Sequence, residues 1–166
     1  MSTPASVLRD AFERHTWATL RLLDHLEALD AGTITEGVPG TYGPILETLS
    51  HLVNADGRYL ERLEHPVLPD YEPGPPEPIG ELRTRVQALA SRWEAALGRL
   101  ESGTLVARID RSATDGWVVD PAETLLLLQA LHHGDDHRAQ VCSTLGALGL
   151  EVPDLDVWSF WEDRRS

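Results

Sequence analysis

The chain has 166 residues, enough for one domain with a hydrophobic core, and it carries a net charge of −13. This acidity argues against nucleic-acid binding, because contacts to a phosphate backbone need clustered cations, and against docking on an anionic membrane. The single cysteine, Cys142, excludes an intrachain disulfide, and the longest apolar run, 125–128, is too short to cross a bilayer. Residues 1–10 show no signal-peptide pattern, so we expect a cytoplasmic protein.

Apolar residues recur at spacings of three and four in four long stretches of the chain. This periodicity is typical of amphipathic helices packed in a bundle, and it predicts helices over residues of about 5–30, 44–64, 79–102 and 121–145. Pro44 suits the first turn of the second helix, and the sequence Asp120-Pro121-Ala122-Glu123 is a favourable start for the fourth.

The segments between these stretches differ in character. Residues 66–78 contain six prolines and predict a long, stiff connection that crosses an end of the bundle. Residues 104–119 alternate like strands and predict a small hairpin or an irregular loop before the fourth helix. Three large aromatics in the tail, 151–166, should pack on the bundle or on a partner subunit. We expect one all-α domain over residues 1–166, a four-helix bundle with a long crossover between its second and third helices.

The fourth expected helix contains three of the seven histidines. His133 and His137 are four residues apart and therefore share a helix face, where two neutral imidazoles can bind one metal ion. On a helical wheel His137 falls within the apolar arc and His133 at its edge, whereas His132 points away. Metal ligation and a hydrogen-bonded role in the core both explain such a pair.

Three polar residues elsewhere fall in or beside apolar stripes. His51 lies at the edge of the stripe in the second helix and is either a third ligand or a surface histidine. His15 lies centrally in the first stripe; we favour a packed core histidine over a fourth ligand or a pocket donor. Asp56 lies on the apolar side of the second helix, where it would orient a ligand histidine or pair with an arginine.

Familiar catalytic motifs do not match the chain. The zincin protease motif His-Glu-x-x-His has the spacing of His133 and His137, but Gly134 stands where that motif has its general base. Di-iron bundles need Glu-x-x-His on two helices, a pattern that the chain lacks. Cys142 has no neighbouring base to activate it, so we interpret it as a small buried hydrophobe.

Three segments resemble the DinB-like family of four-helix bacterial proteins, also called YfiT-like. His51-Leu-Val-Asn-Ala-Asp is similar to the segment that carries the family's first metal histidine. His133-x-x-x-His137-Arg138-Ala139-Gln140 is close to the family motif His-x-x-x-His-Arg-Gly-Gln, with Ala139 in place of a glycine. Pro153-Asp-Leu-Asp-Val-Trp158 resembles the tail of many members, so the resemblance covers nearly the whole chain.

The resemblance implies a homodimer in which His51, His133 and His137 bind one divalent ion, zinc or nickel. It assigns no catalytic residue, and His15, Asp56 and Arg138 are the candidates to support the ligands or line a pocket. Arg138 either anchors a substrate carboxylate or pairs with an acidic neighbour.

The resemblance also suggests a chemistry, because characterised members transfer bacillithiol or isomerise maleylpyruvate with mycothiol. Three neutral ligands leave the ion its double charge and an open position, which lowers the pKa of a bound water or thiol. We therefore expect a metal-dependent enzyme that activates a low-molecular-weight thiol or water for attack on a small electrophile, as a thiol transferase, isomerase or hydrolase. The alternatives are a non-catalytic metal- or small-ligand-binding stress-response protein and a plain bundle with structural histidines.

Overall fold

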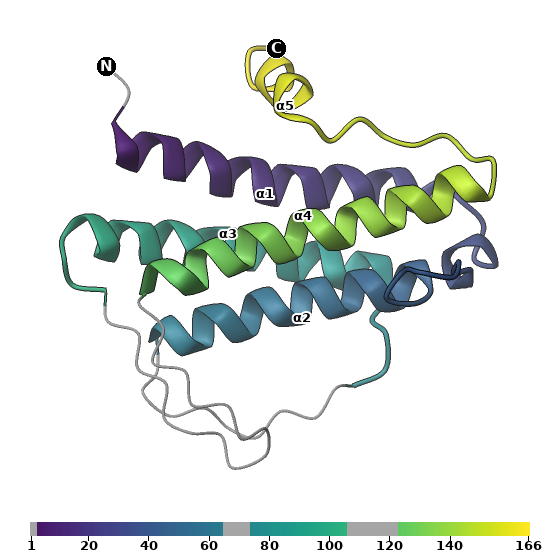
Figure 1. Cartoon of the computed structure of the whole chain (residues 1–166), viewed down its shortest axis with the longest axis horizontal. Helices are drawn as coiled ribbons and strands as arrows, with labels where there is room; N and C mark the ends of the chain where they lie inside the picture. Colours follow the sequence, from purple (N-terminus) through teal and green to yellow (C-terminus); the bar gives the residue numbers. More distant parts are fainter. Residues whose placement is uncertain (1–2, 65–73, 106–122) are drawn as a thin grey trace.

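The computed structural model describes residues 3–64, 74–105 and 123–166, and these ranges form helices and connecting segments without strands (Figure 1). The α-helices are α1 (Pro4–Glu27), α2 (Ile45–Glu64), α3 (Ile79–Glu101), α4 (Glu123–Ala147) and α5 (Val157–Asp163), and a 3₁₀ turn, η1 (Thr33–Thr35), precedes α2. The predicted all-α class is confirmed for this part of the chain. The hairpin or loop expected over 104–119 lies outside the described residues except for its first two.

The four long helices lie side by side around one core. Helix α1 packs against α3 and α4, and α2 packs against the same two helices, so α1 and α2 occupy opposite corners. Helices α2 and α3 run in one direction and α1 and α4 in the other (Figure 1). The last turn of α2 and the first turn of α3 therefore lie at opposite ends of the molecule, as the predicted crossover requires.

Local sequence signals explain where the helices begin. Thr3 caps α1 by accepting a hydrogen bond from the Ser6 backbone N–H, and the Ser6 side chain accepts one from the Thr3 backbone. Pro4 occupies the first turn, where a missing N–H costs nothing. Asp156 caps the short helix α5 in the same way, accepting from the Ser159 N–H at 2.8 Å.

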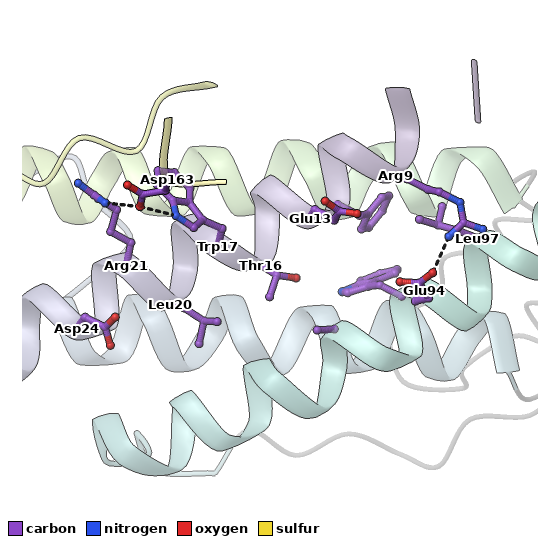
Figure 2. A pocket seen from close by; sticks show the side chains of 13 residues that line it. Arg9, Glu13, Thr16, Trp17, Leu20, Arg21, Asp24, Glu94, Leu97 and Asp163 are labelled. Carbon is purple, nitrogen blue, oxygen red and sulfur yellow. Dashed lines mark hydrogen bonds and ion pairs between the residues drawn. The ribbon is translucent and has the colours of Figure 1, made fainter. Parts of the chain in front are cut away.

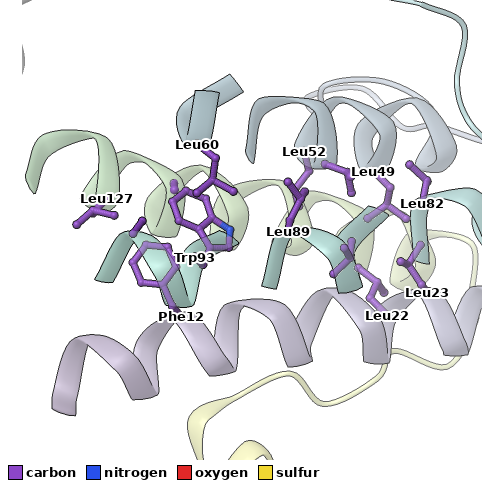
Figure 3. Packing of buried hydrophobic residues seen from close by; sticks show 14 of the residues in the cluster. Phe12, Leu22, Leu23, Leu49, Leu52, Leu60, Leu82, Leu89, Trp93 and Leu127 are labelled. Atoms are coloured by element: carbon purple, nitrogen blue, oxygen red, sulfur yellow. The ribbon is translucent and has the colours of Figure 1, made fainter. Parts of the chain in front are cut away.

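Large apolar side chains from all four long helices meet in the core (Figure 3). Leu22, Leu52, Leu82 and Leu127 are each at most 1% exposed. Full burial of a leucine side chain stabilises a fold by about 1.5–3 kcal/mol, so the predicted stripes account for the packing of the helices. No helix within the described ranges is long and apolar enough to span a bilayer.

Helix α5, which the sequence analysis did not predict, lies on the outer side of α1 (Figure 1). Of the three tail aromatics, Phe160 packs on Trp17 with ring centroids 5.5 Å apart. Trp158 and Trp161 remain 74% and 50% exposed. The expected packing of the tail on the bundle is therefore met by Phe160, and a contact of the two tryptophans with a partner subunit stays a prediction.

Candidate metal centre

The α2–α4 interface brings together the three histidines singled out from the sequence. His51 from α2 and His133 and His137 from α4 have potential ligand atoms that all lie within 4.8 Å of one another. The Nε2 atoms of His133 and His51 are 3.1 Å apart. The ring centroids of His133 and His137 are separated by 4.3 Å, as expected for neighbours one helical turn apart. Three nitrogen donors from two helices thus face a common point.

The surroundings keep these imidazoles uncharged at neutral pH. Burial lowers the pKa of His133 to about 4, and repulsion from His137 and His51 adds to the effect. The pKa of His51 is also lowered, first by burial and then by His137. Burial likewise lowers the pKa of His137, against the opposing effect of Asp136. Uncharged imidazole is the form that binds metal, so the pocket favours the ligating state.

The hydrogen-bonding state of the cluster fits a metal ion. Within the described residues, Nδ1 of His133 and Nδ1 of His137 are buried without a partner. A buried polar atom left unsatisfied costs about 1–3 kcal/mol. The facing Nε2 atoms of His133 and His51 bring two potential lone pairs together, which a bound cation would satisfy. An all-imidazole donor set suits borderline cations such as Zn²⁺ and Ni²⁺.

Aromatic rings shield the cluster. The Tyr42 ring stacks on His51, with centroids 4.2 Å apart and an interplanar angle of 16°, and meets His137 edge-on at 5.3 Å. The backbone N–H of Tyr42 donates to Gln140 Oε1 at 2.7 Å, which ties this loop to α4. The Tyr59 ring lies edge-on to His133 at 5.8 Å, and burial raises the pKa of its hydroxyl.

A small cavity of about 160 Å³ opens beside His51. Its lining mixes polar and apolar surface and comes from the loop before α2, from α2 itself and from the segment before α3: Tyr42, Glu47, Ser50, His51, Asn54, Gly74 and Pro76. Ser50 Oγ accepts a hydrogen bond from the Glu77 N–H at 2.9 Å, so it also fixes that segment against α2. The cavity gives a small molecule a route to one of the three histidines.

The remaining candidates form a buried polar network in the core. His15 Nε2 lies 2.7 Å from Asp56 Oδ2, and the two residues are 2% and 5% exposed. The Arg138 guanidinium donates to the His15 carbonyl, to Thr19 Oγ1 and to Asp135 Oδ1. It also lies 3.4 Å from His15 Nδ1, so this nitrogen is the acceptor and Nε2 carries the proton donated to Asp56.

These contacts decide between the alternatives left open by the sequence. His15 is buried in the core and hydrogen bonded to Asp56. Asp56 pairs with His15 rather than with an arginine, and its second oxygen, Oδ1, is buried without a partner among the described residues. Arg138 pairs with its acidic neighbour Asp135, whose pKa it lowers together with Arg14. The negative charge of Asp56 acts to raise the pKa of His133, against the larger lowering by burial and by the other two histidines.

Gly134 lies against this network. A Cβ atom added there would be 2.3 Å from His15 Cε1 and 2.7 Å from His15 Nδ1, distances that packed atoms do not tolerate. The glycine that removes the general base of the protease motif is therefore required by the packing of α1 on α4.

The family model described as the DinB family matches residues 1–165 of the chain. The chain belongs to the DinB family. No curated protein matches the sequence. The structure of this DinB protein brings together His133 and His137 of the motif on α4 and His51 on α2. These are the histidines on which the resemblance to the family rests.

The sequence analysis of this DinB protein missed Tyr42 and gave Gln140 no role. Both left a signal in the sequence, because Tyr42 is a lone aromatic in a glycine-rich loop just before the helix of His51, and Gln140 ends the histidine motif. His132 is exposed, in agreement with its exclusion as a ligand. Cys142 is partly buried, and burial raises the pKa of its thiol, which makes it a poor nucleophile.

Proposed function

We propose that this DinB protein is a four-helix-bundle metalloenzyme whose His51, His133 and His137 bind one divalent ion, zinc or nickel. The observation that carries the proposal is the convergence of three histidines from α2 and α4 within 4.8 Å, all with lowered pKa values. A divalent ion with three neutral protein ligands acts as a Lewis acid and lowers the pKa of a water or thiol that binds to it.

The proposed reaction is attack of a low-molecular-weight thiol or of water on a small electrophilic substrate. The cavity beside His51 is the proposed substrate site, and its volume of about 160 Å³ supports a small molecule. Ser50 and Asn54 offer polar contacts there, and Glu47 offers a carboxylate that can accept a proton. Tyr42 and Tyr59 cover part of the histidine cluster, and reduced contact with water strengthens electrostatic interactions within the site.

A second candidate function is a non-catalytic metal- or small-ligand-binding stress-response protein on the same fold. The pairing of His15 with Asp56 favours it, because the two core groups that could move protons are engaged with each other. In either case His15, Asp56 and Arg138 would support the site through packing. The homodimer implied by the resemblance and the cytoplasmic location expected from the sequence remain predictions.

Metal analysis of protein purified without a histidine tag tests the site. We expect one zinc or nickel per chain in the wild type, and less than about a tenth of that in His51→Ala and His137→Ala, because two ligands bind a divalent ion far more weakly than three. His132→Ala is the matched control, since it removes an exposed histidine from the same helix. Wild-type metal content in the two ligand variants, with normal circular dichroism, would refute the assignment.

Activity separates the two candidate functions. Mycothiol, bacillithiol and glutathione are each offered with 1-chloro-2,4-dinitrobenzene, and 4-nitrophenyl acetate is offered alone, to protein with and without its metal. Metal-dependent turnover that is lost in His137→Ala supports the enzyme. Stoichiometric metal binding without turnover of any pair supports the binding protein instead.

A further inference from the structure

A second and larger cavity lies away from the three histidines, and Figure 2 shows the side chains that line it. It lies between α1 and α3 and has a volume of about 510 Å³, about three times that of the cavity beside His51. The three histidines lie between α2 and α4, so this cavity and the candidate metal centre are on different sides of the bundle. Its volume falls within the range of about 300–1,000 Å³ that is usual for small-molecule sites.

Aromatic and aliphatic side chains line the interior of this cavity. Phe12 and Trp93 lie with ring centroids 4.7 Å apart, and both are at most 3% exposed, so this part of the wall is rigid. Trp17, Leu20 and Leu97 complete the apolar lining. This surface suits the apolar body of an organic ligand.

Charged side chains at the same cavity favour a positive ligand. Four carboxylates but only two guanidinium groups line it: Glu13, Asp24, Glu94, Asp163, Arg9 and Arg21. Both arginines are already paired, because Arg9 donates to Glu94 and to both oxygens of Glu101, and Arg21 donates to Asp163. With every direct ion-pair partner of these six residues included, five carboxylates face four guanidinium groups, and the second partners of Arg83 and Arg164 raise the carboxylates to seven. Each of the four lining carboxylates also has an arginine partner, but the carboxylates outnumber the guanidinium groups, so the net negative charge favours a cation over an anion.

One contact shows that an aromatic ring of this cavity accepts a cation. The Arg21 guanidinium carbon lies 5.3 Å from the centroid of the Trp17 ring, while Asp163 accepts hydrogen bonds from Arg21 and from Trp17 Nε1 (Figure 2). Aromatic faces beside carboxylates are the combination by which proteins bind ammonium groups.

We propose that the α1–α3 cavity is a binding site for an organic cation, an ammonium group carried on an apolar body. The proposal is independent of the metal centre, because no residue of the α1–α3 cavity belongs to the histidine cluster. The ligand would place its apolar body against Phe12 and Trp93 and its ammonium group beside Glu13 and Glu94.

Binding can be measured with three probes of similar size and different charge: 2-phenylethylammonium, 2-phenylethanol and 3-phenylpropionate. Indole N–H signals in ¹⁵N–¹H NMR spectra report the site, because Trp17 and Trp93 line the cavity whereas Trp158 and Trp161 do not. We expect 2-phenylethylammonium to shift the signals of Trp17 and Trp93 and to bind at least about tenfold more tightly than 3-phenylpropionate, with weaker binding at high salt.

Variants test the two halves of the site. Glu13→Gln combined with Glu94→Gln should weaken binding of the ammonium probe by about threefold to tenfold, since each exposed charge contributes modestly, whereas Glu81→Gln on α3 should leave it unchanged. Ala90→Phe should fill the cavity and weaken binding by more than about tenfold, with Ala88→Phe, an exposed neighbour, as its control.

Three results would overturn the proposal. The first is binding of 3-phenylpropionate or 2-phenylethanol as tight as that of the ammonium probe. The second is a response of Trp158 and Trp161 equal to that of Trp17 and Trp93. The third is a shift of the Trp17 and Trp93 signals with protein concentration but not with probe, which would assign the cavity to a second copy of the chain.

Discussion

Replacement of Gly134 by alanine adds one methyl group at a close contact between α1 and α4. The new Cβ would lie 2.3 Å from His15 Cε1 and 3.0 Å from Arg138 Nη1. Both side chains are 2% exposed, and His15 is hydrogen bonded to Asp56 at 2.7 Å. Neither can move away without breaking buried hydrogen bonds, so we expect Gly134→Ala to destabilise the protein.

The magnitude follows from three opposing contributions. Overpacking of a well-packed interior costs about 1–3 kcal/mol, and loss or distortion of a buried hydrogen bond to a charged group costs about 1.5–3 kcal/mol. Alanine in place of glycine within a helix stabilises the folded state by about 0.5–1 kcal/mol. The free energy of unfolding of Gly134→Ala should therefore fall by about 1.5–5.5 kcal/mol, and Tm by roughly 3–20 °C for a chain of this length.

Urea unfolding of the metal-free protein, followed by circular dichroism, measures this difference without a contribution from metal binding. Gly57→Ala is the matched control, because Gly57 also lies inside a helix and is buried but has only ordinary contacts, the nearest at 3.8 Å from Arg85 Nη2. It should be neutral or more stable by up to about 1 kcal/mol. In a His15→Ala background the clash with the imidazole disappears and only the 3.0 Å contact with Arg138 Nη1 remains, so the cost of Gly134→Ala should largely vanish. A cost of several kcal/mol that persists in that background would refute the explanation.

Three further predictions concern the histidine cluster. The pKa of His133 is about 4 in the folded protein against an ordinary value of 6.5, so between these pH values the unfolded chain binds a proton that the folded protein does not. The free energy of unfolding of the metal-free protein, measured in urea, should therefore fall by up to roughly 3 kcal/mol as pH falls from 6.5 to 4. This fall should be smaller in His133→Gln and unchanged in His132→Gln. Asp56→Asn should lower the free energy of unfolding by about 1–2 kcal/mol; unchanged zinc affinity in that variant would limit Asp56 to a structural role. Tyr42→Ala should raise the pKa of His51 in an NMR titration of the metal-free protein, because burial is the main cause of its lowering.

The long helices were predictable because each buries one continuous stripe. The predicted and observed bounds of the second helix, about 44–64 and Ile45–Glu64, differ by one residue, since Pro44 and the following proline-rich segment mark both ends. Helix α5 was not predictable in this way, because seven residues make only two turns and too short a stripe. Its start depends on one cap, Asp156, and its position depends on contacts with α1 such as Phe160 with Trp17.

The candidate site was predictable to different degrees for its different parts. The spacing of His133 and His137 fixes their common face, whereas His51 comes from another helix and needed the family resemblance. Tyr42 could not be placed, because a loop residue has no periodicity and its position depends on a hydrogen bond to a side chain 98 positions away. The partner of Asp56 was equally hidden, since wheel positions show that a carboxylate is buried but not which group from the opposite corner meets it.

Gly134 connects the motif on α4 to this hidden network. In the sequence alone, Gly134 only argues against a protease, because it stands where the protease motif has its glutamate. In the structure its lack of a side chain lets the His15 ring pack directly on α4. Arg138, four residues further along the helix, donates to Nδ1 of that ring and to the backbone carbonyl of His15. A side chain at 134 would displace His15 and disturb Arg138, which directly follows His137. The histidine spacing supplies two of the three donors. Gly134 and Arg138 beside them hold α4 against α1, and α4 in turn presents those two donors to His51 on α2.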